Sequence, residues 1–296
     1  QAFYHCQYLT SVVVSKENEH YYSLDGVLFE RATHSLVLYP MSKPANFYTV
    51  PEGVTAIQSH AFGDCINLQT VIISDSVVDI GQNAFYGAEK LLAVHFGNGV
   101  TAIRHSAFRE CTELTDVTFG NKLVTIEGQA FSECSSINEL TLPNSVETIG
   151  YCAFAVCSSL VRIELSSNLK TIEHGAFAGC NSLQSIDIPF GVTKIENGTF
   201  EGCTSLRSIS LPITMFSIEN SAFEDCDNLV RVRYDGNMLT KLFLSINEYD
   251  NEDLIRARWQ YSFLGWLILI GLIVIVVVIV RRATKKKLQK QQLQPP

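Results

Sequence analysis

The sequence predicts a β-rich solenoid of 23-residue repeats followed by one transmembrane α-helix. Three observations lead to this fold class. A Phe recurs eight times at a constant spacing of 23 residues, four further columns of apolar or small residues keep the same spacing, and an uncharged apolar stretch follows the repeats. A fixed period with a fixed apolar template is typical of solenoids, in which each unit buries its apolar side only against its neighbours.

One repeat shows the template. Relative to Phe154, an apolar residue lies eight positions earlier at Val146, Ile149 lies five earlier, Cys157 three later and Leu160 six later. The residues that follow Leu160 alternate between apolar and polar, as in a short strand with one buried face. The Phe column consists of Phe62, Phe85, Phe108, Phe131, Phe154, Phe177, Phe200 and Phe223.

Equal connections between equivalent strands predict a parallel sheet, with successive coils about 4.8 Å apart. Pro, Gly or Ser follows most of these strands, as expected where a strand ends and a turn begins. The Ala-Phe-x-x-Cys corner is too short for a full helix, and we expect a tight helical turn there.

The pattern resembles the BspA-type (treponemal-type) leucine-rich repeat, whose consensus runs L-x-x-I-x-I-P-x-x-V-x-x-I-G-x-x-A-F-x-x-C. The resemblance covers most of the chain and is specific in period and residue type. It implies a leucine-rich-repeat solenoid on a surface protein of mucosal microbes, either oral bacteria or trichomonad-like protists, that takes part in adhesion. The motif residues are structural, so the resemblance transfers no catalytic residue and implies no enzyme activity.

The N-terminal part departs from the regular array. Residues 1–14 fit the end of an upstream repeat, so we expect the solenoid to begin earlier and the chain to be a fragment. Residues 15–50 interrupt the register, and two apolar runs, 27–29 and 36–39, flank a polar turn. This pattern predicts a β-hairpin insert. It is either a side-mounted binding element or a decoration on the edge of the coil stack.

Residues 51–234 form the predicted regular array, and the outward strand positions form its most orderly exposed surface. Solenoids commonly bind proteins or glycans on such a face, although a mixed polar face is also what any solvated sheet surface shows. The outward positions include small residues such as Ser208 and Ser210. The candidate ligand-binding residues are His95, Asp116, Thr118, Glu139, Thr141, Arg162, Glu164, Asp187, Arg231 and Arg233.

Seven of the nine cysteines share one template position, where Ala88 stands in the remaining repeat. Stacked equivalent side chains point in parallel rather than at each other, which disfavours disulfides even though neighbouring coils are within bridging range. We expect buried, reduced Cys residues that act as small apolar groups. Cys152 lies outside the column and is a candidate exposed thiol. The column consists of Cys65, Cys111, Cys134, Cys157, Cys180, Cys203 and Cys226.

The remaining polar residues form no recognisable chemical motif. The seven histidines are scattered, no C-x-x-C pair occurs, and Gly97-Asn98-Gly99 is a turn rather than a phosphate-binding loop. We therefore predict no catalytic residue, no metal and no cofactor. Asn197-Gly198-Thr199 is the one glycosylation sequon, which matters only in a protein secreted by a eukaryote.

The C-terminal part predicts a membrane anchor. Residues 235–262 are expected to cap the last coil and lead to the membrane. Residues 263–280 are 18 uncharged, Ile-, Val- and Leu-rich residues, which is long enough for a transmembrane helix. Residues 281–296 contain six basic and no acidic residues. By the positive-inside bias this tail is cytoplasmic and the solenoid extracellular, and the tail also suits anionic lipid.

Together these features predict a single-pass plasma-membrane protein whose solenoid binds an extracellular protein or glycan, with no nucleic-acid partner. Adhesion to host matrix, host cells or other microbes follows from the resemblance. Two alternatives stay open: a recognition receptor that signals through a partner, and an inert surface-coat protein.

Overall fold

The computed structural model describes residues 6–235, all within one compact unit. This range contains twenty β-strands, and none of its residues forms a helix that is long and apolar enough to cross a membrane. The predicted transmembrane helix (263–280), the basic tail (281–296) and the cap beyond residue 235 lie outside the described residues.

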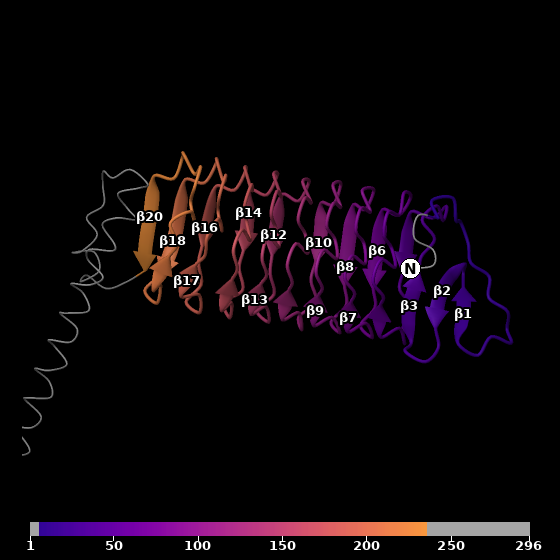
Figure 1. The fold of residues 1–296 in the computed structure, drawn as a ribbon. Helices are drawn as coiled ribbons and strands as arrows, with labels where there is room; N and C mark the ends of the chain where they lie inside the picture. Colours follow the sequence, from indigo (N-terminus) through magenta and orange to yellow (C-terminus); the bar gives the residue numbers. More distant parts are fainter. Residues whose placement is uncertain (1–5, 236–296) are drawn as a thin grey trace, which may run out of the picture. The chain divides into compact units, whose positions relative to one another are not determined.

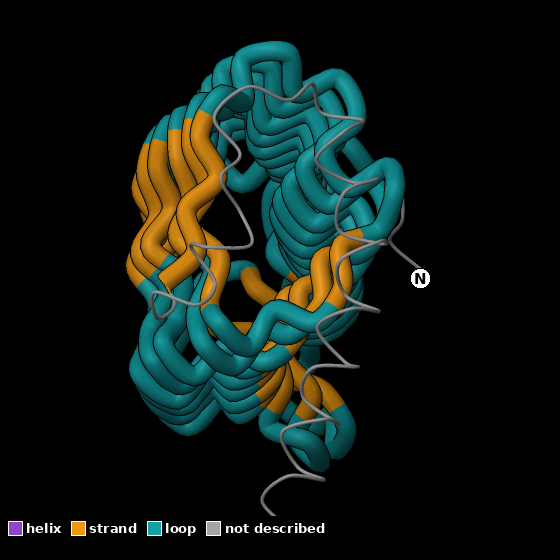
Figure 2. The backbone as a smooth tube through the Cα atoms, turned by 90° about the vertical axis from the view of Figure 1, so that its left-hand side faces the viewer, coloured by secondary structure: helices purple, strands orange, loops and turns teal. Residues whose placement is uncertain are grey.

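Each coil contributes two strands to the stack (Figures 1 and 2). We number the coils 1 to 8 by their Phe, from Phe62 in coil 1 to Phe223 in coil 8. The short strands, just before the Phe, are β5 (Ala56–Ile57), β7 (Asp79–Ile80), β9 (Ala102–Ile103), β11 (Thr125–Ile126), β13 (Thr148–Ile149), β15 (Thr171–Ile172), β17 (Lys194–Ile195) and β19 (Ser217–Ile218). The longer strands, after the Phe, are β6 (Thr70–Ile73), β8 (Ala93–Phe96), β10 (Asp116–Thr118), β12 (Glu139–Thr141), β14 (Arg162–Glu164), β16 (Ser185–Asp187), β18 (Ser208–Pro212) and β20 (Arg231–Asp235).

The 23-residue period becomes the register of two parallel lines of strands. Glu139 pairs with Arg162 between β12 and β14, and Thr125 pairs with Thr148 between β11 and β13. Three N-terminal strands, β1 (Tyr21–Leu24), β2 (Val27–Glu30) and β3 (Ser35–Leu38), join the short strands in a nine-stranded sheet. Its order is β1-β2-β3-β5-β7-β9-β11-β13-β15, and β17-β19 form a further pair. The longer strands and β4 (Phe47–Thr49) form the sheets β10-β8-β6-β4, β12-β14 and β16-β18-β20.

The predicted hairpin is present as β2 (Val27–Glu30) and β3 (Ser35–Leu38), which pair antiparallel. A further strand, β1 (Tyr21–Leu24), joins β2 through Asp25 and Gly26, whose φ angles are 49° and 73°. Two successive positive φ angles are typical of a tight hairpin turn. Because β3 also pairs in parallel with β5, the three-stranded meander continues the short-strand sheet at its N-terminal edge (Figure 1).

A stack of aromatic rings runs through the core. Neighbouring rings of the Phe column lie 4.5 to 5.6 Å apart between centroids, with their planes within 10° of parallel. Tyr39, which precedes Phe62 by 23 residues, extends the stack at 5.0 Å. The strand β4 (Phe47–Thr49) likewise pairs with β6 at an offset of 23 residues. The period therefore continues before coil 1, although the apolar template does not.

The corner after the Phe is a tight turn, as expected, but its geometry is not helical. The second residue after the Phe has a positive φ in all eight coils, from 53° at Asp64 to 71° at Gly179. A right-handed helix needs negative φ, so this residue ends any helical turn. The turn is closed by a hydrogen bond from the Cys N–H to the Phe carbonyl, 3.2 Å from Cys134 to Phe131. The Phe N–H donates to the next coil, as from Phe85 to the Ala107 carbonyl at 2.7 Å.

Candidate functional site

The outward side chains of the longer strands form one polar surface, which we call the strand face. They are the eighth and tenth residues after each Phe, because alternate residues of a strand point to the same side. His95 is half-buried, and the other nine candidates are exposed: Asp116, Thr118, Glu139, Thr141, Arg162, Glu164, Asp187, Arg231 and Arg233.

The strand face is acidic in its middle. Coils 3 to 6 each contribute one carboxylate, and the only guanidinium among them, Arg162, lies 2.7 Å from Glu164 Oε1. His95 Nε2 lies 4.0 Å from the Asp116 carboxylate. Among the described residues, the carboxylates of Glu139 and Asp187 have no side-chain partner, so both are available to a ligand.

One outward position differs from the expectation. Ser210 is buried, with 8% of its surface exposed. It is a small side chain in register between Asp187 and Arg233, so larger neighbours on both sides limit its exposure. The usable strand face therefore narrows before it reaches the basic pair Arg231 and Arg233 in coil 8.

The column cysteines are buried inside the stack as free thiols, whereas Cys6 and Cys152 are free thiols that are only partly buried. From coil 3 onward, each thiol donates to the carbonyl of the preceding coil's Phe, as in Cys134 Sγ to Phe108 O at 3.0 Å. Burial raises the pKa of the Cys134, Cys157 and Cys180 thiols, that of Cys180 to about 12. Such thiols stay protonated at neutral pH, which suits a structural position rather than a reactive one.

The two ends of the sequon differ in exposure, and the described histidines join no group that could hold a metal ion. Asn197 is exposed, but Thr199 is fully buried and its hydroxyl donates to the Glu196 carbonyl at 2.8 Å. Within residues 6–235, no group of three or more His, Cys, Asp or Glu side chains could hold a metal ion.

The structure contains a pocket that the sequence analysis missed. It has a volume of about 380 Å³ and opens beside the short strands of coils 3 to 6. Two glycines create the hollow. Gly150 stands four residues before its Phe, where the adjacent coils have Glu127 and Glu173, and Gly128 stands three before its Phe, where the adjacent coils have His105 and Tyr151.

Tyr151 closes one side of the pocket. Its ring lies across Gly128, where an added Cβ would come within 2.3 Å of the ring. The hydroxyl lies 3.2 Å from His105 Nδ1, and the ring stacks on His174 at 5.3 Å. Thr125 and Thr148 also line the pocket. The sequence signal for this site is the absence of side chains at positions 128 and 150, which neither the apolar spacing nor the alternation along the strands reveals.

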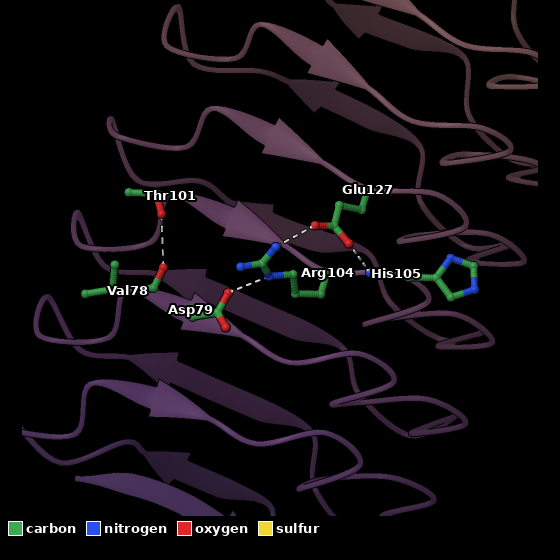
Figure 3. A network of polar contacts seen from close by, with 6 residues as sticks. All are labelled: Val78, Asp79, Thr101, Arg104, His105 and Glu127. Carbon is green, nitrogen blue, oxygen red and sulfur yellow. Dashed lines mark hydrogen bonds and ion pairs between the residues drawn. The ribbon is translucent and has the colours of Figure 1, made fainter. Parts of the chain in front are cut away.

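An ion-pair network borders the pocket (Figure 3). Arg104 donates from Nε to Asp79 Oδ1 at 2.8 Å and from a terminal nitrogen to Glu127 Oε1 at 2.9 Å. Glu127 Oε2 accepts the backbone N–H of His105 at 3.0 Å. These hydrogen bonds to Asp79 and Glu127 raise the pKa of Arg104, so the guanidinium is fully charged at any physiological pH.

Comparisons with solved structures agree with this fold. A leucine-rich repeat protein from Eubacterium ventriosum is 22% identical over 85% of this chain and 59% of its own, with a TM-score of 0.58. One from Bacteroides ovatus is 23% identical over 75% of this chain and 70% of its own, with a TM-score of 0.49. A leucine-rich cell surface protein from Faecalibacterium prausnitzii is 22% identical over 80% of this chain and 100% of its own, with a TM-score of 0.35. At 22% identity, the match with the TM-score of 0.58 supports the fold alone.

No curated protein matches the chain. The family model described as BspA type leucine rich repeat region matches residues 41–158 and 125–242. These two matches together span more than half of the sequence, and they cover the strands from which the parallel stack is built. The chain therefore belongs to the BspA-type leucine-rich repeat family.

Proposed function

We propose that this chain is a cell-surface binding protein whose solenoid adheres to host matrix, host cells or other microbes. The observation that carries the proposal is the strand face, where coils 3 to 6 each present a carboxylate at a fixed 23-residue interval. A rigid parallel sheet holds these groups in place, so a ligand pays little of the ordering cost that a flexible surface would demand. The ligand is an extracellular protein or glycan.

Membrane anchoring is part of the same proposal, and it rests on the sequence. Residues 263–280 are apolar and long enough to span a bilayer, and the basic tail after them suits the cytoplasmic leaflet and its anionic lipid. Residues 6–235 contain 26 acidic and 13 basic side chains, a net charge of −13. An acidic ectodomain repels the phosphates of nucleic acid, and the repeat residues are structural, so the proposed activity is binding without catalysis.

The test measures binding of the purified full chain to immobilised matrix proteins and host-cell membranes. In the strand-face variant, Glu139, Glu164 and Asp187 are changed to Lys. In the matched control, three exposed carboxylates off that face, Glu52, Glu89 and Glu224, are changed to Lys, which alters the net charge equally.

Saturable binding that is lost only in the strand-face variant is the expected result. Loss in both variants would indicate long-range charge rather than a contact surface. Retention in both would move the ligand to another surface, such as the meander β1–β3. Binding to no surface would favour the coat protein, or a receptor that works through a cytoplasmic partner of residues 281–296.

A further inference from the structure

The pocket beside the short strands repeats an arrangement found two coils earlier, with one side chain missing. A shift of 46 residues relates the two places in the sequence. It takes Asp79 to Thr125, Arg104 to Gly150 and Glu127 to Glu173. The upstream place is the ion-pair network of Figure 3, and the downstream place is the pocket.

The backbone contacts of the two places are the same. Arg104 N donates to the Ile80 carbonyl at 3.2 Å, and Gly150 N donates to the Ile126 carbonyl at 2.8 Å. One oxygen of Glu173 accepts the Tyr151 N–H at 2.8 Å, as one oxygen of Glu127 accepts the His105 N–H. Glu173 is therefore held in the position and orientation in which Glu127 receives a guanidinium.

The second oxygen of Glu173 has no partner among the described residues. In Glu127 the equivalent oxygen accepts from Arg104 at 2.9 Å. The hydroxyls of Thr125 and Thr148 on the pocket wall are also without side-chain or backbone partners in residues 6–235. The pocket thus has unused acceptors in the places where its upstream counterpart binds Arg104.

Position 150 cannot supply that Arg. An added Cβ at Gly150 would lie 2.6 Å from the Gly128 nitrogen and 2.7 Å from the Glu127 carbonyl carbon. Because both are backbone atoms, a side chain at position 150 would force the two coils apart. An Arg side chain that fills the pocket therefore has to reach it from the solvent side and not from position 150.

We propose that the pocket binds an Arg side chain of an extracellular protein partner. The guanidinium donates to the free oxygen of Glu173 and to the Thr125 hydroxyl, and the nearby Glu127 adds negative potential. A planar fork of donors matches carboxylate geometry better than an ammonium does. The inference goes beyond the proposed function, since this site lies on the short strands and not on the strand face.

The test uses N-acetyl-arginine amide as the probe and the full chain in detergent micelles. Titration should shift the amide resonances of Gly128, Gly150 and Tyr151. N-acetyl-citrulline amide has the same shape without the charge, and its affinity should be lower by about tenfold, the effect of one charge-assisted hydrogen bond. Raising the salt concentration should lower the affinity of the Arg probe and leave the affinity of the citrulline probe unchanged.

Glu173→Gln is the informative variant, because its amide oxygen still accepts the Tyr151 N–H while the charge is lost. It should lower the affinity for the Arg probe by about tenfold. Glu139→Gln removes the same charge from the strand face and should leave this affinity unchanged. Equal binding of citrulline, an unchanged affinity in Glu173→Gln, or shifts produced by methyl hexosides instead of the Arg probe would overturn the inference.

The two proposals fail separately. If the strand-face variant loses matrix binding while the Arg probe binds no variant, the strand face stands and the pocket inference falls. If the Arg probe binds as expected but strand-face changes have no effect on any matrix protein, the pocket stands without the proposed adhesion surface.

Discussion

Val156 adopts a backbone conformation that β-branched residues avoid. Its φ is 59°, in the left-handed region shared by the second residue after every Phe. The other coils place Gly, Asp or Glu at this position. Val is the least suitable of the four, because its two γ-carbons crowd the backbone in this region. Half of its surface is exposed, so packing compensates for little of the strain.

Replacing Val156 with Asn should therefore stabilise the protein. Asn tolerates the left-handed region and avoids the unfolded-state entropy that Gly would add. We expect the free energy of unfolding to rise by about 1 kcal/mol, measured by chemical denaturation.

The reverse change in the next coil is the matched control. Gly179 has the same conformation, with a φ of 71°, and an added Cβ would meet only ordinary contacts of 3.5 Å or more. Gly179→Val should destabilise by about 1–3 kcal/mol. If Val156→Asn also destabilised, the exposed Val side chain would have to make a contact that outweighs the strain.

The column thiols should resist alkylation because each of them is buried. Burial raises the pKa of Cys180 to about 12. At pH 8 the reactive thiolate is then about one part in ten thousand of that thiol, since each pKa unit is tenfold.

We expect iodoacetamide to modify only Cys6 and Cys152 in the native protein, because these two are partly exposed. The raised pKa of Cys152, caused mainly by its partial burial, should make its reaction slow. Peptide mass mapping with and without denaturant is the measurement. Rapid native labelling of Cys134 or Cys157 would mean that the coils open locally.

At the scale of the element, the Phe stack predicts that the cost of deleting a ring depends on the position of that ring in the stack. Phe131 is fully buried between two parallel rings, at 5.2 Å from Phe108 and 5.6 Å from Phe154. Phe131→Ala should cost about 3–5 kcal/mol, the range for deleting a buried aromatic side chain. Phe223 is only partly buried and stacks on one described ring, Phe200. Phe223→Ala should cost clearly less in the same denaturation experiment, and equal costs would contradict a stack stabilised by both neighbours.

The strands and the core were predictable from the sequence because both depend on apolar spacing. Alternation after Leu160 predicted β14, and the columns predicted which side chains are buried. The strand β1 was not predicted because its residues show no apolar alternation. The Asp25-Gly26 turn was the only sequence feature that indicated it. The helical turn was wrongly expected because spacing says nothing about the sign of φ; the Gly, Asp and Glu at the second position after the Phe carried that information.

The pocket was not predictable in the same way, for a different physical reason. Gly150 stands where the repeat consensus has Gly, between coils that have Glu127 and Glu173, so the sequence gives no sign that a pocket opens there. Only the contacts between coils show that position 150 has no room for a Cβ and that Glu173 is left with a free oxygen. The strand face was easier, because outward positions follow directly from strand alternation.

At the scale of the whole described unit, the constant register predicts that one complete coil can be deleted without loss of the fold. Every parallel pair within the array joins residues 23 apart, so each coil meets the same surface on both sides. Stability in such a stack is close to a sum of coil and neighbour terms. Deleting residues 189–211, the whole of coil 7, would bring β16 against β20 in the register that β18 now has with each of them. It would also place Cys226 against the carbonyl of Phe177 in place of Phe200.

We expect the deletion variant to fold, with an unchanged β-sheet circular dichroism signal per residue and a modestly lower Tm. Its strand face in coils 3 to 6 and its pocket remain, so Arg-probe binding should persist.

Deleting only residues 189–200 is the control. It removes the short strand β17 and the core residue Phe200 but keeps the longer strand β18, so the coil is left incomplete. That half-coil variant should lose cooperative unfolding. If the full-coil deletion lost cooperative unfolding as the half-coil deletion does, the coils would not be interchangeable. The stability of the stack would then not be a sum of coil and neighbour free energies.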